Sequence, residues 1–559
     1  MESEKGISQP SVRTSAETAP NAKAVEYPSG ARRAITVLGI LFGVFVFALD
    51  ISIISTAIPR ITTEFNSLAD VGWYGSAFFL TLAATQSIWG NLYKYFSLRV
   101  VFITSIMVFE IGSIICAVAP NSPTLIAGRA VQGMGGSGST LGSYAIAAFI
   151  VPPHQVPIVI GLIGCTFSVA SVAGPLLGGV FTQSLSWRWC FWINLPIGAV
   201  TIASVMLFFR TPAHSKPPGK TPIRQILLSF DPLGVVLLVA SLICYFLALQ
   251  RGGISEPWNS STVIGLLVGW IMLSGLFAVN EWWQGDRALV VLRILKIRSI
   301  AGVCAFVLFL YGAYFAILYN VPLYFQAIHG LSPQDSGIRT IPVILATSAT
   351  SLISSFVISR VGIYQPFLIA GGALAAIGAG LIYTFDLDTS LGKEISYQII
   401  FGIGTGVVQI PAMVGGTVVA DGDKAISLST GMLIEAVSIL EVTQFFSAAY
   451  VIAATDAIMN NLILNNIPRY APGVNPLEVI HIGVGGLQDV FTGETLRGVR
   501  QAFVDGLKGA WALIVVLFCI SFLCAFITRW PGRMVSEVVV DKDGPQAGNS
   551  TNEPVRAGA

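Results

Sequence analysis

Long apolar stretches separated by short polar segments run through the chain from about residue 35 to residue 530. A helix needs about 20 mostly apolar residues to cross the hydrocarbon core of a bilayer. Fourteen stretches are long enough, and no alternating, strand-like pattern recurs. The pattern therefore predicts an all-α polytopic membrane protein with 14 transmembrane helices. The expected helices cover residues 35–58, 72–90, 99–119, 124–150, 157–182, 189–209, 231–250, 262–281, 299–320, 337–359, 366–385, 395–419, 425–454 and 508–528.

The composition argues against a soluble protein. Of the 559 residues, 54% are hydrophobic and 11% are charged, whereas soluble domains carry about 25% charged residues. Seven cysteines all lie in apolar stretches without metal-ligand spacing, and no phosphate-binding loop of the Gly-x-x-x-x-Gly-Lys-[Ser/Thr] type occurs. We therefore expect no metal, no cofactor and no direct use of ATP. The net charge of +2 gives no reason to expect a nucleic-acid partner, and no residue constellation typical of an enzyme is found.

Lysines and arginines are distributed unevenly between the two sides of the membrane. Cytoplasmic loops carry an excess of both residue types. With an even number of spans, the side that holds both termini has 21 of these residues and the other side has nine. This bias predicts cytosolic termini, and the polar residues 1–34 and 529–559 are expected to form disordered tails. The glycosylation sequon at Asn259 then lies in an outside loop. We expect the plasma membrane, with a vacuolar or vesicle membrane as the alternative.

Two opposite charges stand inside the first and fourth apolar stretches. Ionisable groups within a membrane are costly and usually functional. Asp50 lies toward the outer end of the first stretch, and Arg129 lies near the outer end of the fourth, so the two are expected to pair. Arg129 shares one helix face with Gly133, Gly136 and Thr140. The pair is a candidate for proton coupling, and the alternatives are a purely structural ion pair or a capping role for Asp50.

Three further acids lie in apolar stretches. Glu110 is near the middle of the third stretch and is a second candidate for carrying the proton. Glu441 is near the midpoint of the thirteenth, where Gln444 shares its face, and Glu435 lies closer to the cytosol. The candidates for lining a substrate cavity are Gln132, Glu441, Gln444 and Glu435, and Glu441 is also a candidate for carrying the proton. The alternative for Glu435 is an ion pair with a basic residue at the membrane surface.

Small residues form a stripe along the fifth stretch. Ala170, Gly174 and Gly178 recur every four residues, which allows another helix to approach closely. Pro175 removes one backbone donor and kinks the helix. We expect this helix to pivot against a neighbour, although a stripe of this kind alone often means only packing.

These segments resemble motifs of the major facilitator superfamily. Gly161, Ala170, Gly174, Pro175, Gly178 and Gly179 are similar to its antiporter motif, with alanine at 170 where glycine is usual. Arg129 with Gln132-Gly133 resembles the motif of the fourth span, and Leu49-Asp50 through Pro59 resembles that of the first. The stretch 187–196 is similar to the fourteen-span drug:proton antiporter branch. Phe109-Glu110 with Gly112-Ser113 and the stretch 322–326 resemble its fungal members.

The resemblance implies a twelve-span core made of two six-helix halves. The halves would be residues 35–209 and 299–528, joined by a linker at 210–298 that contains two inserted helices. The residues themselves predict a long outside loop at 455–507 within the second half, with a short helix near 487–507. In the loop after the second span, Gly90 and Arg99 match the family, but Lys94 stands where aspartate is usual. This departure leaves open how the inward-closed state is latched.

The resemblance also implies an activity. We expect a proton-coupled efflux transporter that works by alternating access and exports a small organic molecule, such as a toxin, a drug or a secondary metabolite. Cargo and proton are expected to compete for one polar cavity. The alternative is an importer or facilitator of a siderophore, sugar or organic anion on the same fold. The expected partners are the cargo, protons and the lipid bilayer, and the expected state is a monomer.

Overall fold

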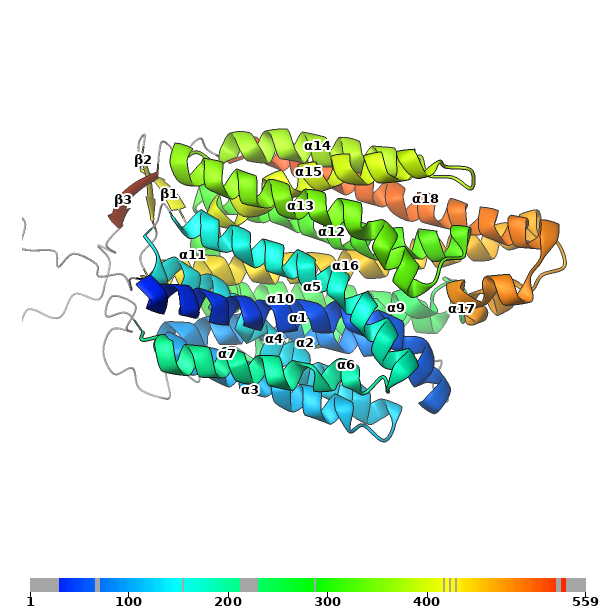
Figure 1. The fold of residues 1–559 in the computed structure, drawn as a ribbon, viewed down its shortest axis with the longest axis horizontal. Coiled ribbons are helices and arrows are strands. Elements are labelled where there is room, and N and C mark those ends of the chain that lie inside the picture. The colour runs from blue at the N-terminus through cyan, green and yellow to red at the C-terminus, as the bar shows by residue number, and fades with distance from the viewer. Residues whose placement is uncertain are drawn as a thin grey trace, which may run out of the picture.

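The computed structural model describes residues 30–65, 71–152, 155–211, 230–285, 288–415, 418–421, 424–427, 430–528 and 534–538. Nearly all of these residues form helices that run along the long axis of the molecule (Figure 1). We call the end where α1 begins and α18 ends the terminal end, and the end that carries α17 the loop end. Most of the two expected tails, and most of residues 210–230 at the start of the expected linker, lie outside the described residues.

The first six expected spans each overlap a helix. Asn121 shows how one begins, because its side chain accepts a hydrogen bond from the backbone N–H of Thr124, with Pro123 in the first turn. A short helix, α6, leads into α7. The bounds are α1 Gly30–Phe65, α2 Val71–Tyr95, α3 Leu98–Ala117, α4 Ser122–Ile150, α5 Val156–Ser184, α6 Trp189–Trp192 and α7 Asn194–Phe208.

The last six expected spans also overlap helices. Gly330 and Gly362 follow two of these helices at φ +66° and +74°, a left-handed conformation that glycine adopts without strain and that ends a helix. The bounds are α12 Arg298–His329, α13 Pro333–Val361, α14 Gln365–Tyr383, α15 Leu391–Gly415, α16 Thr430–Tyr470 and α18 Gly493–Cys524.

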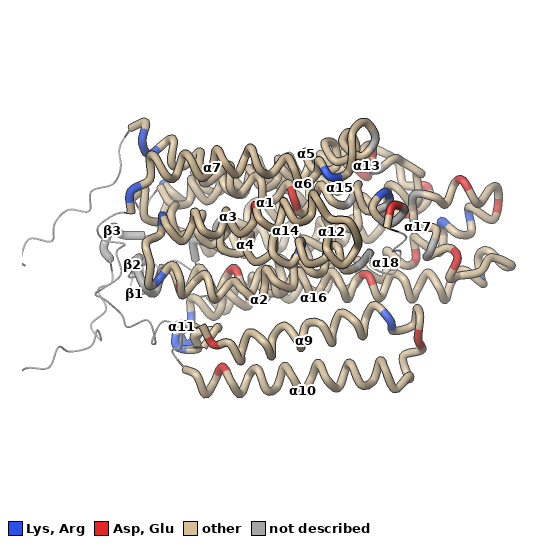
Figure 2. Tube along the Cα trace, turned by 90° about the horizontal axis from the view of Figure 1, so that it is seen from below, with Lys and Arg blue, Asp and Glu red and all other residues tan. Residues whose placement is uncertain are grey.

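The two spans of the linker region form a separate pair, α9 (Pro232–Arg251) and α10 (Ser261–Gln284), followed by the short α11 (Leu292–Leu295). α9 packs on α10, α2 and α16, while α10 lies on the outside of the bundle (Figure 2). Only 6% of the most apolar window of α10 is buried, so this helix presents an apolar surface suited to lipid.

Two expectations for the second half are wrong. Residues 455–507 are mostly helical, because α16 continues to Tyr470, α17 spans Pro476–Val490 and α18 begins at Gly493. The short helix therefore begins before the expected 487–507 and overlaps only its first residues, while most of that range belongs to α18. The thirteenth span begins at Thr430 rather than at 425, because residues 424–427 form a strand. It is one of three short strands at the terminal end. Their bounds are β1 Val418–Asp421, β2 Lys424–Ser427 and β3 Met534–Val538.

The strands form one small sheet in the order β1-β2-β3. β1 and β2 are antiparallel, and β3 pairs with β2 in parallel. β3 belongs to the C-terminal segment that was expected to be disordered, so that expectation is wrong for 534–538. Valine-rich sequence in β1 and β3 suits a strand.

Eleven helices in the described part of the chain are long and apolar enough to cross a membrane. The other three expected spans correspond to α2, α4 and α15, which carry many Gly, Ser, Thr and Gln residues. Charged positions concentrate toward the two ends of the bundle, and few lie in its middle (Figure 2). The chain is therefore a multi-pass membrane protein.

The helices from α1 to α7 pack mainly on one another, as do those from α12 to α18. α1 packs on α5 and α7, and α4 packs on α2 and α3. α12 packs on α16 and α18, and α15 packs on α13 and α14. The two groups meet chiefly where α5 packs on α13 and α2 packs on α16. Side chains at these two contacts can therefore report on both groups.

Candidate functional site

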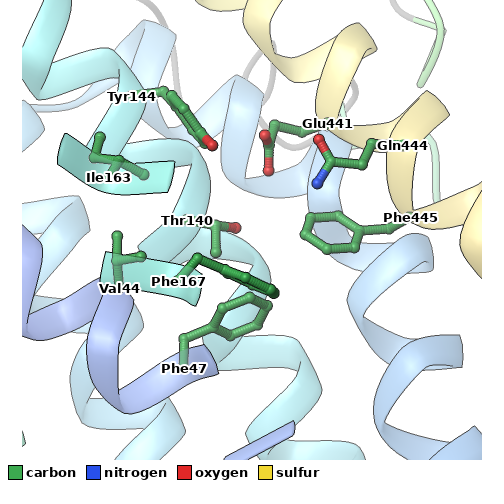
Figure 3. Close-up of a pocket in the computed structure, with 9 residues that line it drawn as sticks. All are labelled: Val44, Phe47, Thr140, Tyr144, Ile163, Phe167, Glu441, Gln444 and Phe445. Carbon is green, nitrogen blue, oxygen red and sulfur yellow. The ribbon is translucent and has the colours of Figure 1, made fainter. Parts of the chain in front are cut away.

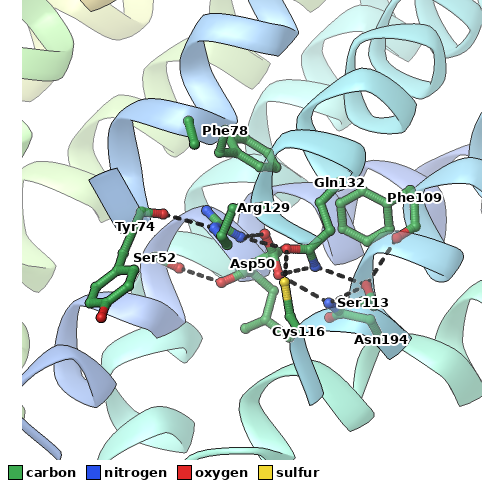
Figure 4. A network of polar contacts seen from close by, with 12 residues as sticks. Asp50, Ser52, Tyr74, Phe78, Phe109, Ser113, Cys116, Arg129, Gln132 and Asn194 are labelled. Carbon is green, nitrogen blue, oxygen red and sulfur yellow. Dashed lines mark hydrogen bonds and ion pairs between the residues drawn. The ribbon is translucent and has the colours of Figure 1, made fainter. Parts of the chain in front are cut away.

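Asp50 on α1 and Arg129 on α4 form a buried ion pair, as their depths in the sequence suggested (Figure 4). Both side chains are almost fully buried, at 0% and 1% exposure. Nη1 of Arg129 donates to Oδ2 of Asp50, and Nε donates to the backbone oxygen of Tyr74 at 2.9 Å. Because a charge in a low-dielectric interior needs a partner, each of these residues depends on the other.

Amide side chains complete the hydrogen bonding of Asp50. Its Oδ1 accepts from Nε2 of Gln132 at 2.9 Å and from Nδ2 of Asn194 at 3.1 Å. Both amides also donate to Oγ of Ser113, at 2.9 and 3.2 Å. Gln132, expected in the substrate cavity, therefore lies in the network around Asp50. Asn194 and Ser113 fall within segments that resemble the family, but the sequence did not single them out as functional.

Glu110 lies beside this network. It stands one helical turn before Ser113 on α3, toward the terminal end. Both of its carboxylate oxygens are buried without a hydrogen-bond partner among the described residues. The carboxyl faces Gly198 on α7, where an added Cβ would lie 2.6 Å from Cδ of Glu110. The absence of a side chain at 198 therefore makes room for the acid.

A small cavity lies between helices of the two groups (Figure 3). Its volume is ≈ 20 Å³, enough for about one water molecule, so it is too small for an organic cargo in this conformation. Aromatic and apolar side chains cover one side, and Glu441 and Gln444 of α16 face Thr140 and Tyr144 of α4. The lining residues are Val44, Phe47, Thr140, Tyr144, Ile163, Phe167, Glu441, Gln444 and Phe445.

Glu441 is the acid of this cavity. It is fully buried beside the hydroxyl of Thr140, and its carboxylate oxygens make no hydrogen bond of normal geometry to a described residue; Oε1 of Gln444 is also unpartnered there. A buried polar group without a partner costs free energy, and binding a proton or a ligand would remove that cost. Asp50 and Gln132 do not line this cavity. The Asp50 network and the Glu441 cavity are therefore two separate places in this structure, whereas a single polar cavity was expected.

Gln86 on α2 is a polar residue that the sequence did not distinguish. Both atoms of its amide are buried without a partner among the described residues. One turn further along α2, a Cβ added at Gly90 would lie 2.6 Å from Oγ of Ser438 on α16. Ser438 precedes Glu441 by one turn, and α2 and α16 run in opposite directions, so Gln86 lies near the level of Glu441.

Glu435 is not part of the cavity, which corrects its assignment as a cavity residue. Its carboxylate pairs with Lys94 on α2 and lies 3.8 Å from Nη2 of Arg293 on α11. The alternative of an ion pair with a basic residue is therefore confirmed. The aspartate that the family usually carries at position 94 is absent, but a charge pair still joins α2 to α16 there, with lysine on α2 and the acid on α16.

We expect Lys94→Glu to weaken this contact and to lower both thermal stability and export. Lys94 is about one-third exposed and Glu435 is buried, so the cost lies between the ~1 kcal/mol of a surface pair and the ~3–5 kcal/mol of a buried pair. The exchange of both charges, Lys94→Glu with Glu435→Lys, should restore part of the loss. Restoration is incomplete because Arg293 repels the lysine introduced on α16. A double variant no better than Lys94→Glu would contradict the pairing.

The small-residue stripe of α5 packs against α1. Oγ of Ser52 donates to the backbone oxygen of Ala170 at 3.2 Å. A Cβ at Gly174 would lie 2.8 Å from the backbone nitrogen of Ile53, and a Cβ at Gly178 would lie 2.7 Å from the oxygen of the same residue. The stripe therefore holds two helices of the first group together.

A second face of α5 meets α13 across the contact between the two groups. A Cβ at Gly161 would lie 3.0 Å from Cβ of Ser355. Near the other end of the helix, Cβ of Pro175 lies 3.5 Å from the Cβ position of Gly337. Gly161 and Pro175, rather than the stripe, are thus the motif residues placed to sense a movement between the groups.

Gly174→Leu is expected to abolish export and to lower stability by at least the ~1–3 kcal/mol typical of overpacking, because the backbone of α1 cannot give way. Gly179→Leu is the matched control, since a Cβ at Gly179 meets no described atom within 4 Å. Export by each variant, together with its melting temperature in detergent, checks the prediction. Parental export by Gly174→Leu would show that the α1–α5 contact does not limit the cycle.

Two further residues that the sequence analysis singled out, Arg99 and Asn259, lie away from the cavity and from the network around Asp50. Arg99 at the start of α3 donates to the backbone oxygen of Met206 on α7. Asn259 is exposed in the turn between α9 and α10, at the loop end. Neither residue contributes to the cavity or to the network around Asp50.

A buried ion pair, an acidic cavity and two helix groups in contact define a membrane transporter. The chain belongs to the major facilitator superfamily, whose family model matches residues 40–425. It is 40% identical to MFS-type transporter thnB of Trichoderma harzianum, covering 92% of this chain and 90% of that protein. It is 38% identical to the dehydrocurvularin exporter of Aspergillus terreus, covering 91% and 87%. The proton:xylose symporter XylE has the same fold, with a TM-score of 0.56 at 14% identity over 90% and 98% of the two chains.

Proposed function

We propose that the protein is a proton-coupled efflux transporter that exports a small organic molecule by alternating access. The observation that carries this proposal is the pair of separate acidic places, the Glu441 cavity between the helix groups and the Asp50–Arg129 pair within one of them. Relatives that cover about nine-tenths of the chain include a protein named as an exporter. This favours export over the alternative of an importer or facilitator.

The proposed architecture has 14 spans. Residues 35–209 and 299–528 form two six-helix halves, and the 210–298 region contributes the inserted pair α9 and α10. The contacts of α5 with α13 and of α2 with α16 support this division, since they are where the two halves meet. We place both termini in the cytosol, the monomer in the plasma membrane, and a glycan on Asn259 at the outer face.

The proposed proton path uses Asp50, Arg129 and Glu110. A proton that arrives from outside neutralises the carboxylate of Asp50 and so breaks its ion pair with Arg129. Because Arg129 stays charged, it favours release of that proton and re-formation of the pair. Glu110, one turn beyond Ser113 toward the terminal end, is placed to receive the proton on its way to the cytosol. The amides of Gln132 and Asn194 hold the Asp50 carboxylate in position.

The proposed cargo is amphipathic. The rings of Phe47, Phe167 and Phe445 offer an apolar, aromatic wall that suits a flat or ring-containing molecule. Across the cavity, Glu441 and Gln444 offer hydrogen-bond acceptors to hydroxyl or amine groups of the cargo. An acid in this place favours neutral or cationic molecules over anions. The cavity must widen to admit such a molecule, as alternating access requires.

A comparison of a deletion strain with its parent tests the direction of transport. If the protein is an exporter, its cargo accumulates inside the deletion cells and declines in their medium. The export profile would also reveal the identity of the cargo. Lower uptake of a supplied siderophore, sugar or organic anion by the deletion cells would instead establish the importer.

A further inference from the structure

Two phenylalanine rings separate the Glu441 cavity from the Asp50–Arg129 pair. Phe47 lines the cavity, and its ring centroid lies 5.9 Å from that of Phe78 on α2. On the far side of the two rings from the cavity, the guanidinium carbon of Arg129 lies 4.4 Å from the centroid of the Phe78 ring (Figure 4). Both rings are buried. The cavity wall is therefore linked to the ion pair through Phe47 and then Phe78.

α4 provides a seat for the two rings. A Cβ at Gly136 would lie 2.9 Å from Cδ2 of Phe47 and 3.6 Å from Cζ of Phe78, so the rings lie directly over this glycine. Gly136 shares a helix face with Arg129 before it and with Thr140 after it. Arg129 belongs to the ion pair and Thr140 lines the cavity, and about 16 Å of helix separates them. The rings thus occupy the face of α4 between the two places.

We propose that Phe47 and Phe78 form a barrier to protons between the cargo cavity and the Asp50–Arg129 pair, which cargo opens by displacing Phe47. This inference rests on the proposed proton-coupled export. A phenyl ring has no group that relays a proton, and two packed rings exclude the water that would do so. A displaced Phe47 no longer holds Phe78 against Arg129, so the ion pair loosens only when cargo is present. Phe47 is in this sense a positioning residue that acts through Phe78.

The barrier has a physical reason. An exchanger that let protons cross without cargo would dissipate the gradient that drives it. A ring that links the two acidic places prevents that leak, because the Asp50–Arg129 pair stays closed to protons while the cavity is empty. The small volume of the cavity agrees with this, since it has room for about one water molecule.

The test uses the purified full-length protein in proteoliposomes with a pH-sensitive dye inside and an acidic medium outside. Proton entry is recorded first without cargo and then with it. We expect Phe47→Ala to raise the cargo-free proton flux at least threefold over the parent and to reduce its stimulation by cargo. Phe47→Leu, which keeps an apolar side chain over Gly136, should stay within twofold of the parent. This rescue separates a barrier from a general requirement for folding.

Phe445→Ala is the matched control. Phe445 also lines the cavity and lies 6.0 Å from Phe47 between ring centroids, but it has no ring contact with Phe78 or Arg129 among the described residues. It should weaken cargo export without a cargo-free leak. If Phe47→Ala does not fold, Gly136→Ala replaces it, because the added methyl group pushes the Phe47 ring away and should raise the leak in the same way.

Three outcomes would overturn the barrier. The first is a parental cargo-free flux in Phe47→Ala, or in Gly136→Ala where that variant replaces it. The second is an equal leak in Phe445→Ala, which would show that any lost packing opens the path. The third is an equal leak in Phe47→Leu. If the parent itself shows no proton flux linked to cargo, the proposed proton coupling fails. If the parent shows that flux and one of the three outcomes occurs, only the barrier fails, so the two failures are distinguishable.

Discussion

Asp50→Asn is expected to reduce proton-driven export by roughly tenfold or more, because each 1.4 kcal/mol lost from a step costs a factor of ten. Asparagine keeps the shape of the side chain but neither binds a proton nor balances the charge of Arg129. The remaining guanidinium is then buried without its counter-ion, at a cost of ~3–5 kcal/mol. Proton-driven flux in proteoliposomes and the melting temperature in detergent are the two measurements.

A second variant separates coupling from folding. Asp50→Asn combined with Arg129→Gln removes both charges, so it should regain much of the lost stability but none of the proton-driven flux. Glu64→Gln is the control for loss of an ordinary ion pair. Glu64 is 41% exposed, and its Oε1 lies 2.9 Å from Nη1 of Arg188. A hydrogen bond from Trp187 lowers the pKa of the Glu64 carboxyl. A surface pair of this kind is worth ~0–1 kcal/mol, so export should be unchanged. Parental proton-driven flux in Asp50→Asn would remove Asp50 from the mechanism.

Glu441→Gln is expected to impair cationic cargo selectively. The side chain is fully buried and lines the cavity beside Gln444, so its charge is the nearest one that a bound cation would meet. A charge-assisted hydrogen bond is worth roughly 1.5–3 kcal/mol, which corresponds to about tenfold or more in the export of a cation. Neutral cargo of the same shape should lose less than about twofold, since glutamine still offers one acceptor.

The measurement is a competition export assay on matched cationic and neutral compounds. Glu435→Gln is the control, because it removes a carboxylate from the same helix but outside the cavity. It should affect both compounds alike through the weakened contact with Lys94. An equal loss on both compounds in Glu441→Gln would assign this acid to proton coupling instead of cargo selection. Parental export of both would mean that cargo does not contact Glu441.

The ion pair and the order of the helices could be predicted from the sequence. Apolar stretches of about 20 residues specify spans almost without regard to their neighbours, because backbone groups in lipid must be satisfied within the helix. Asp50 and Arg129 followed from the same physics, since two opposite charges at matching depth in apolar helices must find each other. Each of these inferences needs only the local sequence and the membrane.

Other features depended on which helices are neighbours, and the sequence could not reveal them. The stripe on α5 predicted a close contact but not that its partner is α1. Glu435 and Glu441 are both acids on one helix, and only the presence of Lys94 across from Glu435 separates a surface pair from a cavity acid. In the sequence, Gln86 is one of several amides in apolar spans. Only the contact between α2 and α16 shows that it lies near the level of Glu441.

The ends of helices were also difficult to predict. α16 continues well past the expected span to Tyr470, and its start at Thr430 is set by the small sheet that β1 and β2 form with β3. A strand from the distant C-terminal segment closes this sheet, so no local window contains the information. The helical character of most of 455–507 likewise depends on packing among α16, α17 and α18.

The most direct test of the central claim is cargo accumulation in proteoliposomes that are acidic inside. Proton-coupled export predicts that cargo enters against its own gradient while protons leave, and that accumulation ends when a protonophore collapses the pH gradient. Accumulation driven by protons that move in the same direction as cargo would contradict antiport. Cargo movement that only equilibrates, at a rate unchanged by the protonophore, would contradict proton coupling altogether.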